Sequence, residues 1–368
     1  MFSKLNIYLS KNFLFSFLII FIVFAALLII GDFVEQFRKS TGKNVPLSIV
    51  FQLSILNFFS LINFIVPIVA YFGSLLAFLN LIKSSELIVI NTIGISSTKI
   101  MLPAIFLYFL IGIFFVTIIN PLSVVFYNKY TELEYKYINK SDKFASITKN
   151  GLWLKQHNQI NGFSSVLYAQ QISDNGKTLF NFMLLEYDSD GSFQGRVDGK
   201  KAVLKNNYWN MSEVQVTPKY TSASFYDTYK YSTNINPNDI TNSLASPDGI
   251  SFWRMGKFIN FLEDLGYSAR DFKLYYFNLL ILPLFMSSLV ILSLSIVRDL
   301  KPNDKFSKTI VLSFILIFII YFISNLFDAL GSSSQISPFL SKIITPILIL
   351  VISLIYFQFS FLKKKKII

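Results

Sequence analysis

Six stretches of this chain are long enough and apolar enough to cross a membrane as helices. About 20 consecutive apolar residues span the hydrocarbon layer of a bilayer. The second stretch has 35 residues without a charge, so we expect one long tilted helix that extends beyond the bilayer and can kink at Pro67. The predicted spans are Asn12–Ile30, one within Ser48–Ile82, Ile100–Ile119, Leu274–Val297, Thr309–Phe327 and Ile343–Leu362.

The region between the third and fourth spans has the pattern of a β domain. In Glu213–Thr217 apolar and polar residues alternate, which places Val214 and Val216 on one face of a strand. Further strand-like segments are Ser165–Ile172, Leu179–Tyr187 and Lys201–Leu204. They are separated by turn signals at Asn161-Gly162, Asp174-Asn175-Gly176, Asp190-Gly191, Asp198-Gly199 and Asn206-Asn207. This spacing favours a sandwich, a jelly roll or a barrel.

These patterns divide the chain into three parts. Residues 1–120 carry the first three spans, and residues 121–250 hold the β domain with its flanking linker. Residues 251–368 begin with an amphipathic helix over Ser251–Leu265 and continue with the last three spans. The predicted fold class is therefore an α-helical membrane protein with six transmembrane helices and an inserted β domain.

The distribution of charge sets the orientation that we expect. The chain has 33 Lys and Arg against 21 Asp and Glu, but between Pro121 and Lys273 the counts are 17 and 15. The basic excess thus flanks the spans, which does not fit a folded nucleic-acid-binding domain. With the N-terminus inside, twelve basic residues lie on the cytoplasmic side and four on the outer side. If the second run formed two spans, the β domain would lie on the cytoplasmic side.

The composition excludes several kinds of chemistry. The chain has no Cys and one His, His157, which leaves little from which to build a zinc site. Gly176-Lys177-Thr178 resembles the end of a Walker A loop, but Gln171 stands where its first glycine is required. The predicted spans hold no Asp, Glu, Lys, Arg or His, which argues against proton coupling. Transport by this chain would therefore draw its energy from a partner.

Two polar features adjoin the spans. Ser85–Ser96, between the second and third spans, predicts a short helix with Glu86 in its first turn and Gly94 at its end. It could seat in a groove of a soluble partner, or Glu86 could simply cap a loop helix. After the first span, Arg38 and Lys39 could contact lipid phosphates or only anchor the span at the interface.

Five segments carry a resemblance to a known family. They are Phe33–Lys39, Ser85–Ser96, Gly151-Leu152-Trp153-Leu154-Lys155, Leu282-Pro283-Leu284 and Ile336-Ser337-Pro338. In their order and spacing the chain resembles the LptF/LptG permeases of the lipopolysaccharide exporter, and it looks closer to LptG. The resemblance implies that the β domain is a periplasmic β-jellyroll and that the protein spans the bacterial inner membrane with both termini in the cytoplasm.

The resemblance also implies partners and roles. The chain would pair with an LptF-like permease and be driven by two copies of an LptB-like ATPase, which uses ATP and Mg, while the chain itself holds no cofactor and no metal. It would extract lipopolysaccharide and pass it to a β-jellyroll bridge that includes an LptC-like protein. Coupling to the ATPase would fall to Glu86, Leu87, Ile90 and Gly94, and phosphate contacts to Arg38 and Lys39.

In three places the chain departs from the family. Asn91 replaces a longer residue in the helix after the second span. Asp32 and Leu279 stand where LptG-like chains can carry a Lys, which removes positive charge from the expected substrate entrance. Three other functions remain open on the residues alone: a membrane-anchored β-domain interaction protein, a lipid-modifying enzyme and a secondary transporter of lipid.

Overall fold

The chain folds into two compact units in a computed structural model. The helical unit comprises Met1–Ile138, Ser251–Trp253 and Lys273–Ile368, and the sheet unit comprises Asn139–Ile250 and Arg254–Phe272. The structure describes residues 4–93, 97–139, 145–148, 151–157, 164–173, 177–188, 190–205, 208–233, 246–264, 268–297, 300–302, 304 and 306–365.

Within the described residues, six helices are long and apolar enough to cross a membrane, as predicted. Five of them are single α-helices, whereas the third, Lys99–Ile138, is interrupted by the π-helical turn Phe115–Ile119 and ends within a second one, Tyr135–Asn139. The α-helices of the helical unit are α1 (Lys4–Ser40), α2 (Leu47–Lys83), α3 (Glu86–Thr92), α4 (Ser97–Phe114), α5 (Asn120–Glu134), α8 (Arg270–Val297), α9 (Ser307–Ser332) and α10 (Pro338–Lys365).

The second apolar run is one helix. α2 continues through Pro67 over 37 residues, so the run does not divide into two crossings. At about 1.5 Å per residue such a helix is roughly 55 Å long, well beyond the hydrocarbon thickness of about 30 Å. This agrees with the long helix expected from the uncharged run.

The helical unit is held together by close approach of its helices. Phe13 and Phe78 meet edge to face, with ring centroids 4.8 Å apart, where α1 packs against α2. A Cβ atom on Gly73 would lie 2.9 Å from the Cα atom of Phe17, and one on Gly112 would lie 2.6 Å from the Cα atom of Pro283. Small residues at such crossings let two backbones approach, which is a common device of membrane helices.

The helices differ in how much of their apolar surface the unit itself covers. Most of α2 and α8 is buried, whereas only a small part of α1, α9 and α10 is. Large apolar side chains such as Phe15, Ile22 and Phe318 are exposed along these outer helices. Water would penalise this surface, so lipid or another membrane helix must cover it.

The sheet unit contains a seven-stranded antiparallel sheet in which neighbouring strands follow one another along the chain. The strands are β1 (Ala145–Thr148), β2 (Gly151–His157), β3 (Ser164–Ser173), β4 (Thr178–Tyr187), β5 (Phe193–Lys205), β6 (Tyr208–Pro218) and β7 (Ser224–Ser232). The expected inserted β domain is thus present, and the described strands pair in the order of a meander. Its buried face carries Leu154, Leu167, Leu184, Val197 and Val214.

One predicted turn in this domain is wrong. Asp190-Gly191 does form the turn between β4 and β5, where the Gly191 N–H donates to the Asp188 carbonyl oxygen over 2.8 Å. Asp198-Gly199, however, lies inside β5. A Cβ atom on Gly199 would lie 2.5 Å from the ring of Phe182. The glycine therefore makes room for an aromatic ring from the neighbouring strand and does not mark a turn.

The amphipathic helix predicted after the β domain is α7 (Phe252–Asp264). It follows a short 3-10 turn at Pro247–Gly249. Its Met255, Ile259 and Leu262 side chains, spaced by four and three residues, are buried. This is the spacing that places apolar side chains on one face of a helix.

Candidate functional site

The short helix α3 lies between two membrane helices, as the sequence predicts. α2 ends at Lys83 and α3 begins at Glu86, and the chain turns because Ser85 adopts a left-handed φ of +60°. The Ser85 carbonyl oxygen accepts hydrogen bonds from the N–H groups of Ile88 and Val89, both at 3.1 Å. These bonds satisfy donors that the first turn of a helix leaves free.

The Glu86 carboxylate accepts two hydrogen bonds from within the helical unit. The Ser84 hydroxyl donates to Oε1 over 3.0 Å, and the Tyr8 hydroxyl donates to Oε2 over 2.8 Å. Tyr8 belongs to α1, so this bond joins the start of the first membrane helix to the start of α3. Two donors fix the direction of the carboxylate, and a carboxylate keeps further acceptor capacity for a cation.

α3 has a buried face and an exposed face. Leu87 and Ile90 are only 7% and 8% exposed and belong to the core of the helical unit. Ile88, Val89 and Ile93 are 47%, 55% and 72% exposed. Leu87 and Ile90, predicted as contacts for a partner, therefore anchor α3 to its own chain, and the outward face is formed by the residues next to them. The fourth predicted contact, Gly94, lies outside the described residues.

Arg38 and Lys39 lie in the last turn of α1 and both contact carboxylates. Arg38 makes a two-pronged ion pair with Glu35, with Nη2 to Oε1 at 2.7 Å and Nε to Oε2 at 3.0 Å. Lys39 Nζ lies 3.5 Å from Glu134 Oε1 on α5. The pair at Arg38 is exposed, and exposed pairs of this kind contribute only about 0–1 kcal/mol. Arg38 can therefore exchange Glu35 for another anion at small cost.

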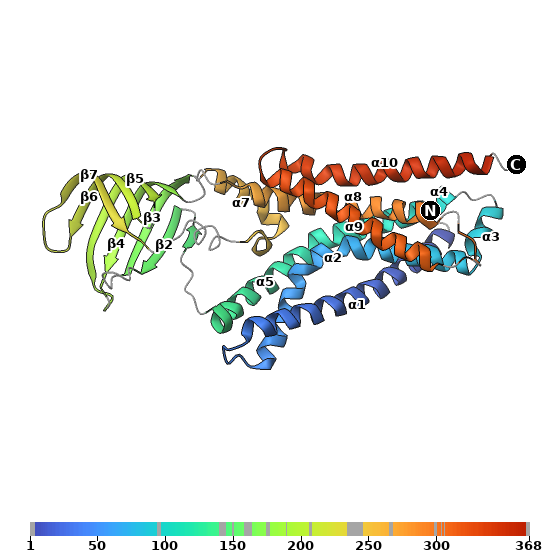
Figure 1. Cartoon of the computed structure of the whole chain (residues 1–368), viewed down its shortest axis with the longest axis horizontal. Coiled ribbons are helices and arrows are strands. Elements are labelled where there is room, and N and C mark those ends of the chain that lie inside the picture. The colour runs from blue at the N-terminus through green and yellow to red at the C-terminus, as the bar shows by residue number, and fades with distance from the viewer. Residues whose placement is uncertain are drawn as a thin grey trace. The chain divides into compact units, whose positions relative to one another are not determined.

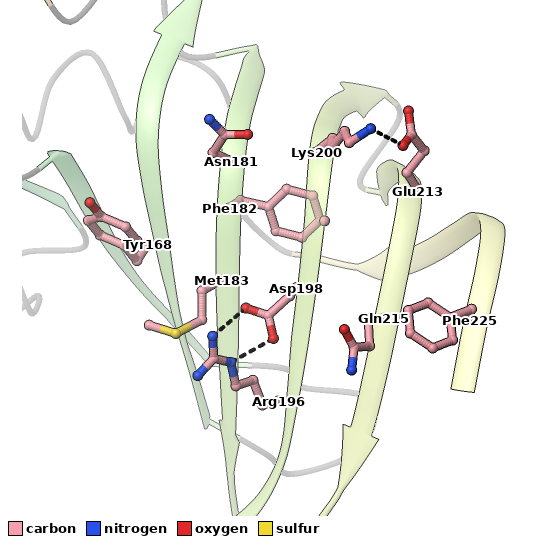
Figure 2. Close-up of a pocket in the computed structure, with 11 residues that line it drawn as sticks. Tyr168, Asn181, Phe182, Met183, Arg196, Asp198, Lys200, Glu213, Gln215 and Phe225 are labelled. Carbon is pink, nitrogen blue, oxygen red and sulfur yellow. Dashed lines mark hydrogen bonds and ion pairs between the residues drawn. The ribbon is translucent and has the colours of Figure 1, made fainter. Parts of the chain in front are cut away.

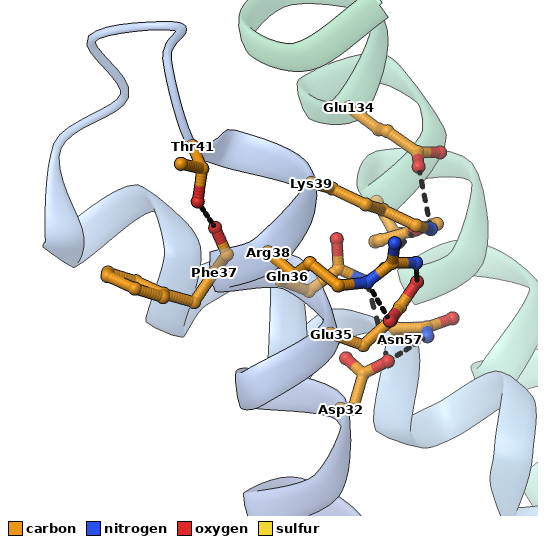
Figure 3. A network of polar contacts seen from close by, with 10 residues as sticks. Asp32, Glu35, Gln36, Phe37, Arg38, Lys39, Thr41, Asn57 and Glu134 are labelled. Carbon is orange, nitrogen blue, oxygen red and sulfur yellow. Dashed lines mark hydrogen bonds and ion pairs between the residues drawn. The ribbon is translucent and has the colours of Figure 1, made fainter.

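Beneath these cations lies a polar network that joins three helices (Figure 3). The Asn57 amide on α2 donates to Asp32 Oδ1 over 2.7 Å. The buried Gln36 amide donates to the same oxygen over 3.4 Å and to the Tyr130 hydroxyl on α5 over 3.2 Å. Asp32 thus joins α1 to α2. The sequence did not predict this role, because Asp32 stood out only as a position where LptG-like chains can carry a Lys.

Among the described residues, no group of three or more His, Asp and Glu is placed to hold a metal ion. The two polar clusters around the candidate residues, Tyr8 with Glu86 and Asp32 with Asn57, lie one at each end of α1. In Figure 1, α3 and the start of α1 lie at one end of the helical unit, and the end of α1 lies at the other.

A long helical unit with a sheet inserted between its third and fourth membrane helices is the architecture expected from the resemblance. A sequence model of the family described as lipopolysaccharide export system permease LptF/LptG matches residues 7–358. The chain belongs to this family. As an LptF/LptG family member with six membrane-length helices, it is a multi-pass membrane permease of lipopolysaccharide export. No curated protein matches the chain.

Several residues of these two clusters were not found from the sequence. Tyr8 lies 78 positions from Glu86, and Tyr130 lies 94 positions from Gln36, so only the fold brings them together. Asn57 did carry a signal, because an amide within a long apolar run needs a partner once it is buried. The outward face of α3 carried none, since all its residues are apolar.

Proposed function

We propose that this LptF/LptG family member is an LptG-type subunit that extracts lipopolysaccharide from the bacterial inner membrane and passes it to a periplasmic β-jellyroll bridge. The observation that carries the proposal is α3. It is anchored by Leu87 and Ile90, and it presents Ile88, Val89 and Ile93 outward beside an acid that is already oriented. Such a helix suits the transfer of force from a soluble ATPase to membrane helices.

Burial explains why a partner at α3 would bind. Covering one aliphatic side chain is worth about 1.5–3 kcal/mol when it becomes fully buried. Three such side chains would give an ATPase groove a firm apolar contact, and Glu86 would add a pair with a cation in that groove. We propose an LptB-like ATPase dimer as this partner, with ATP and Mg bound there and not in this chain.

The exposed apolar surface of the outer helices supports a second membrane partner. We propose that an LptF-like permease covers part of this surface to form a heterodimer, and that an LptC-like protein receives the lipid. In the orientation that the basic residues favour, α3 and both termini lie in the cytoplasm and the sheet unit lies in the periplasm. The jelly-roll form of the β domain belongs to this proposal.

Arg38 and Lys39 are proposed to contact the phosphates of the extracted lipid. Both cations lie in the last turn of α1, at the end of the helical unit opposite α3. A phosphate could replace Glu35 at the exposed guanidinium of Arg38 without a large loss. Since Tyr8 and Arg38 lie on the same continuous helix, a shift of α1 at its α3 end would be felt about 45 Å away.

Reconstitution into liposomes with a co-expressed ATPase and second permease tests the function. We expect ATP-dependent transfer of lipopolysaccharide that is lost when Ile88 and Val89 are both changed to Ser. Lys308→Ala, at another exposed position of the helical unit, serves as the control and should leave transfer intact. Transfer that needs no ATP would instead indicate a secondary transporter, and copurification without any ATPase would indicate an anchored interaction protein.

A further inference from the structure

A pocket of about 460 Å³ opens on the sheet unit (Figure 2). Its centre is a row of five cross-strand neighbours, one from each of β3 to β7: Tyr168, Met183, Asp198, Gln215 and Phe225. Because side chains alternate along a strand, this row lies on the face opposite the buried leucines. The volume is within the range of about 300–1,000 Å³ that small-molecule sites occupy.

Aromatic rings stand at both ends of the row. Tyr168 packs beside Trp153, with ring centroids 4.8 Å apart, and Phe225 at the other end is 78% exposed. The flat face of an aromatic ring is apolar and carries partial negative charge. It therefore accepts the C–H groups that cover one face of a sugar ring.

Between the two ends the pocket is lined by polar groups whose charges are already paired. Arg196 donates two hydrogen bonds to Asp198, at 2.6 and 2.7 Å, and Lys200 pairs with Glu213. The lining side chains thus carry no net charge, so the pocket favours neither anions nor cations. It offers interleaved donors and acceptors, which suit hydroxyl groups because a hydroxyl both donates and accepts.

The backbone on both sides of Lys200 is in an unusual conformation. Asn181 and Glu213 occupy the strands next to β5 and have left-handed φ values of +49° and +52°. A residue other than glycine in this region costs of order 1 kcal/mol or more, and such strain concentrates at binding sites. Both residues line the pocket.

We propose that this pocket is a carbohydrate-binding site that takes a short neutral saccharide. Four of its five strands, β3 to β6, are paired on both sides within the sheet, so only β7, at one end of the pocket, could pair with an extended peptide. A nucleic acid or a phosphate would favour a lining with excess positive charge, whereas this lining carries two cations and two anions. This binding of a saccharide does not depend on the proposed transport function. The proposed function would be needed only if the bound sugar were part of the exported glycolipid.

The test is saturation-transfer NMR on the whole chain in lipid nanodiscs, without ATP or partners. Glycoside detergents must be absent because their head groups are sugars. The probes are maltotriose, lactose and mannotriose, with glucose 6-phosphate and inorganic phosphate as charged counterparts. We expect at least one neutral saccharide to bind better than either charged probe. Phe225→Ala should weaken that binding about 2- to 10-fold, because one aromatic face is lost.

Two further variants sharpen the result. Tyr220→Ala removes an aromatic ring that is 85% exposed but does not line the pocket, and it should leave binding unchanged. Asp198→Asn frees Arg196 from its pair and should shift the preference toward glucose 6-phosphate. The proposal is overturned if no neutral saccharide binds, if a charged probe binds best to the natural chain, or if Tyr220→Ala loses as much as Phe225→Ala.

Discussion

The carboxylate of Glu86 connects the first membrane helix to α3 through the hydroxyl of Tyr8. If Glu86 pairs with a cation of the ATPase, then Glu86→Gln, which keeps the shape but removes the charge, should reduce ATP-driven lipid transfer as much as Glu86→Ala does. Tyr8→Phe should reduce transfer less, about two- to fivefold, because a hydrogen bond to an exposed charged group is worth only about 1 kcal/mol or somewhat more. The measurement is lipid transferred per ATP hydrolysed.

Tyr356→Phe is the matched control, since it removes the hydroxyl of an exposed tyrosine on α10. It should leave the ratio unchanged. A Tyr8→Phe protein with full coupling would show that the bond to Glu86 has no role. A Glu86→Gln protein with full coupling would show that the charge is not used, and Glu86 would then be only a helix-capping acid.

Asp32 gives a second prediction for a single side chain, this time of stability. Asn57→Ala removes the 2.7 Å hydrogen bond to its carboxylate, which is only partly exposed. Leaving that charge less satisfied should destabilise the helical unit by about 1–3 kcal/mol. Asp32→Asn should cost less, because its remaining oxygen still accepts from Asn57. Thermal unfolding of the purified protein compares the two, and an equal loss in both would contradict this account.

Among the elements, the membrane helices were predictable and the details of their contacts were not. Long uncharged runs such as Ser48–Ile82 define a helix by length alone, because a single segment in lipid can satisfy its own backbone groups only as a helix. In α3 every residue from Leu87 to Ile90 is apolar, so the sequence could not tell which pair faces inward. The misplaced turn at Asp198-Gly199 has a similar cause, since glycine serves both turns and close packing against a ring.

The crossing of α4 and α8 yields a prediction at this scale. A Cβ atom on Gly112 would lie 2.6 Å from the Cα atom of Pro283, so Gly112→Ala must push two backbones apart. Overpacking of this kind costs about 1–3 kcal/mol. Gly31→Ala is the control, because nothing lies within 4 Å of a Cβ atom there and alanine favours the helix. The midpoint temperature of thermal unfolding should fall for Gly112→Ala and not for Gly31→Ala. Equal midpoints for the two variants would contradict the close crossing of α4 and α8.

At the scale of the whole molecule, an even number of crossings places both ends of the chain on one side. In Figure 1 the start of α1 and the end of α10 lie at the same end of the helical unit as α3. The family match covers these elements and the inserted sheet together, from residue 7 to residue 358. The side on which this end lies follows only from the basic residues, which favour the cytoplasm.

Cysteine labelling decides this orientation, and the absence of Cys from the chain removes any background. Ser222→Cys is a nearly isosteric change at an exposed position of the sheet unit, and Lys301→Cys lies at an exposed position between α8 and α9. In cells whose outer membrane has been made permeable but whose inner membrane is intact, an impermeant maleimide should label Ser222→Cys and spare Lys301→Cys. Lysis should make both reactive, which controls for buried thiols. The reverse pattern would place the sheet unit in the cytoplasm and separate it from the periplasmic bridge that the proposed function requires.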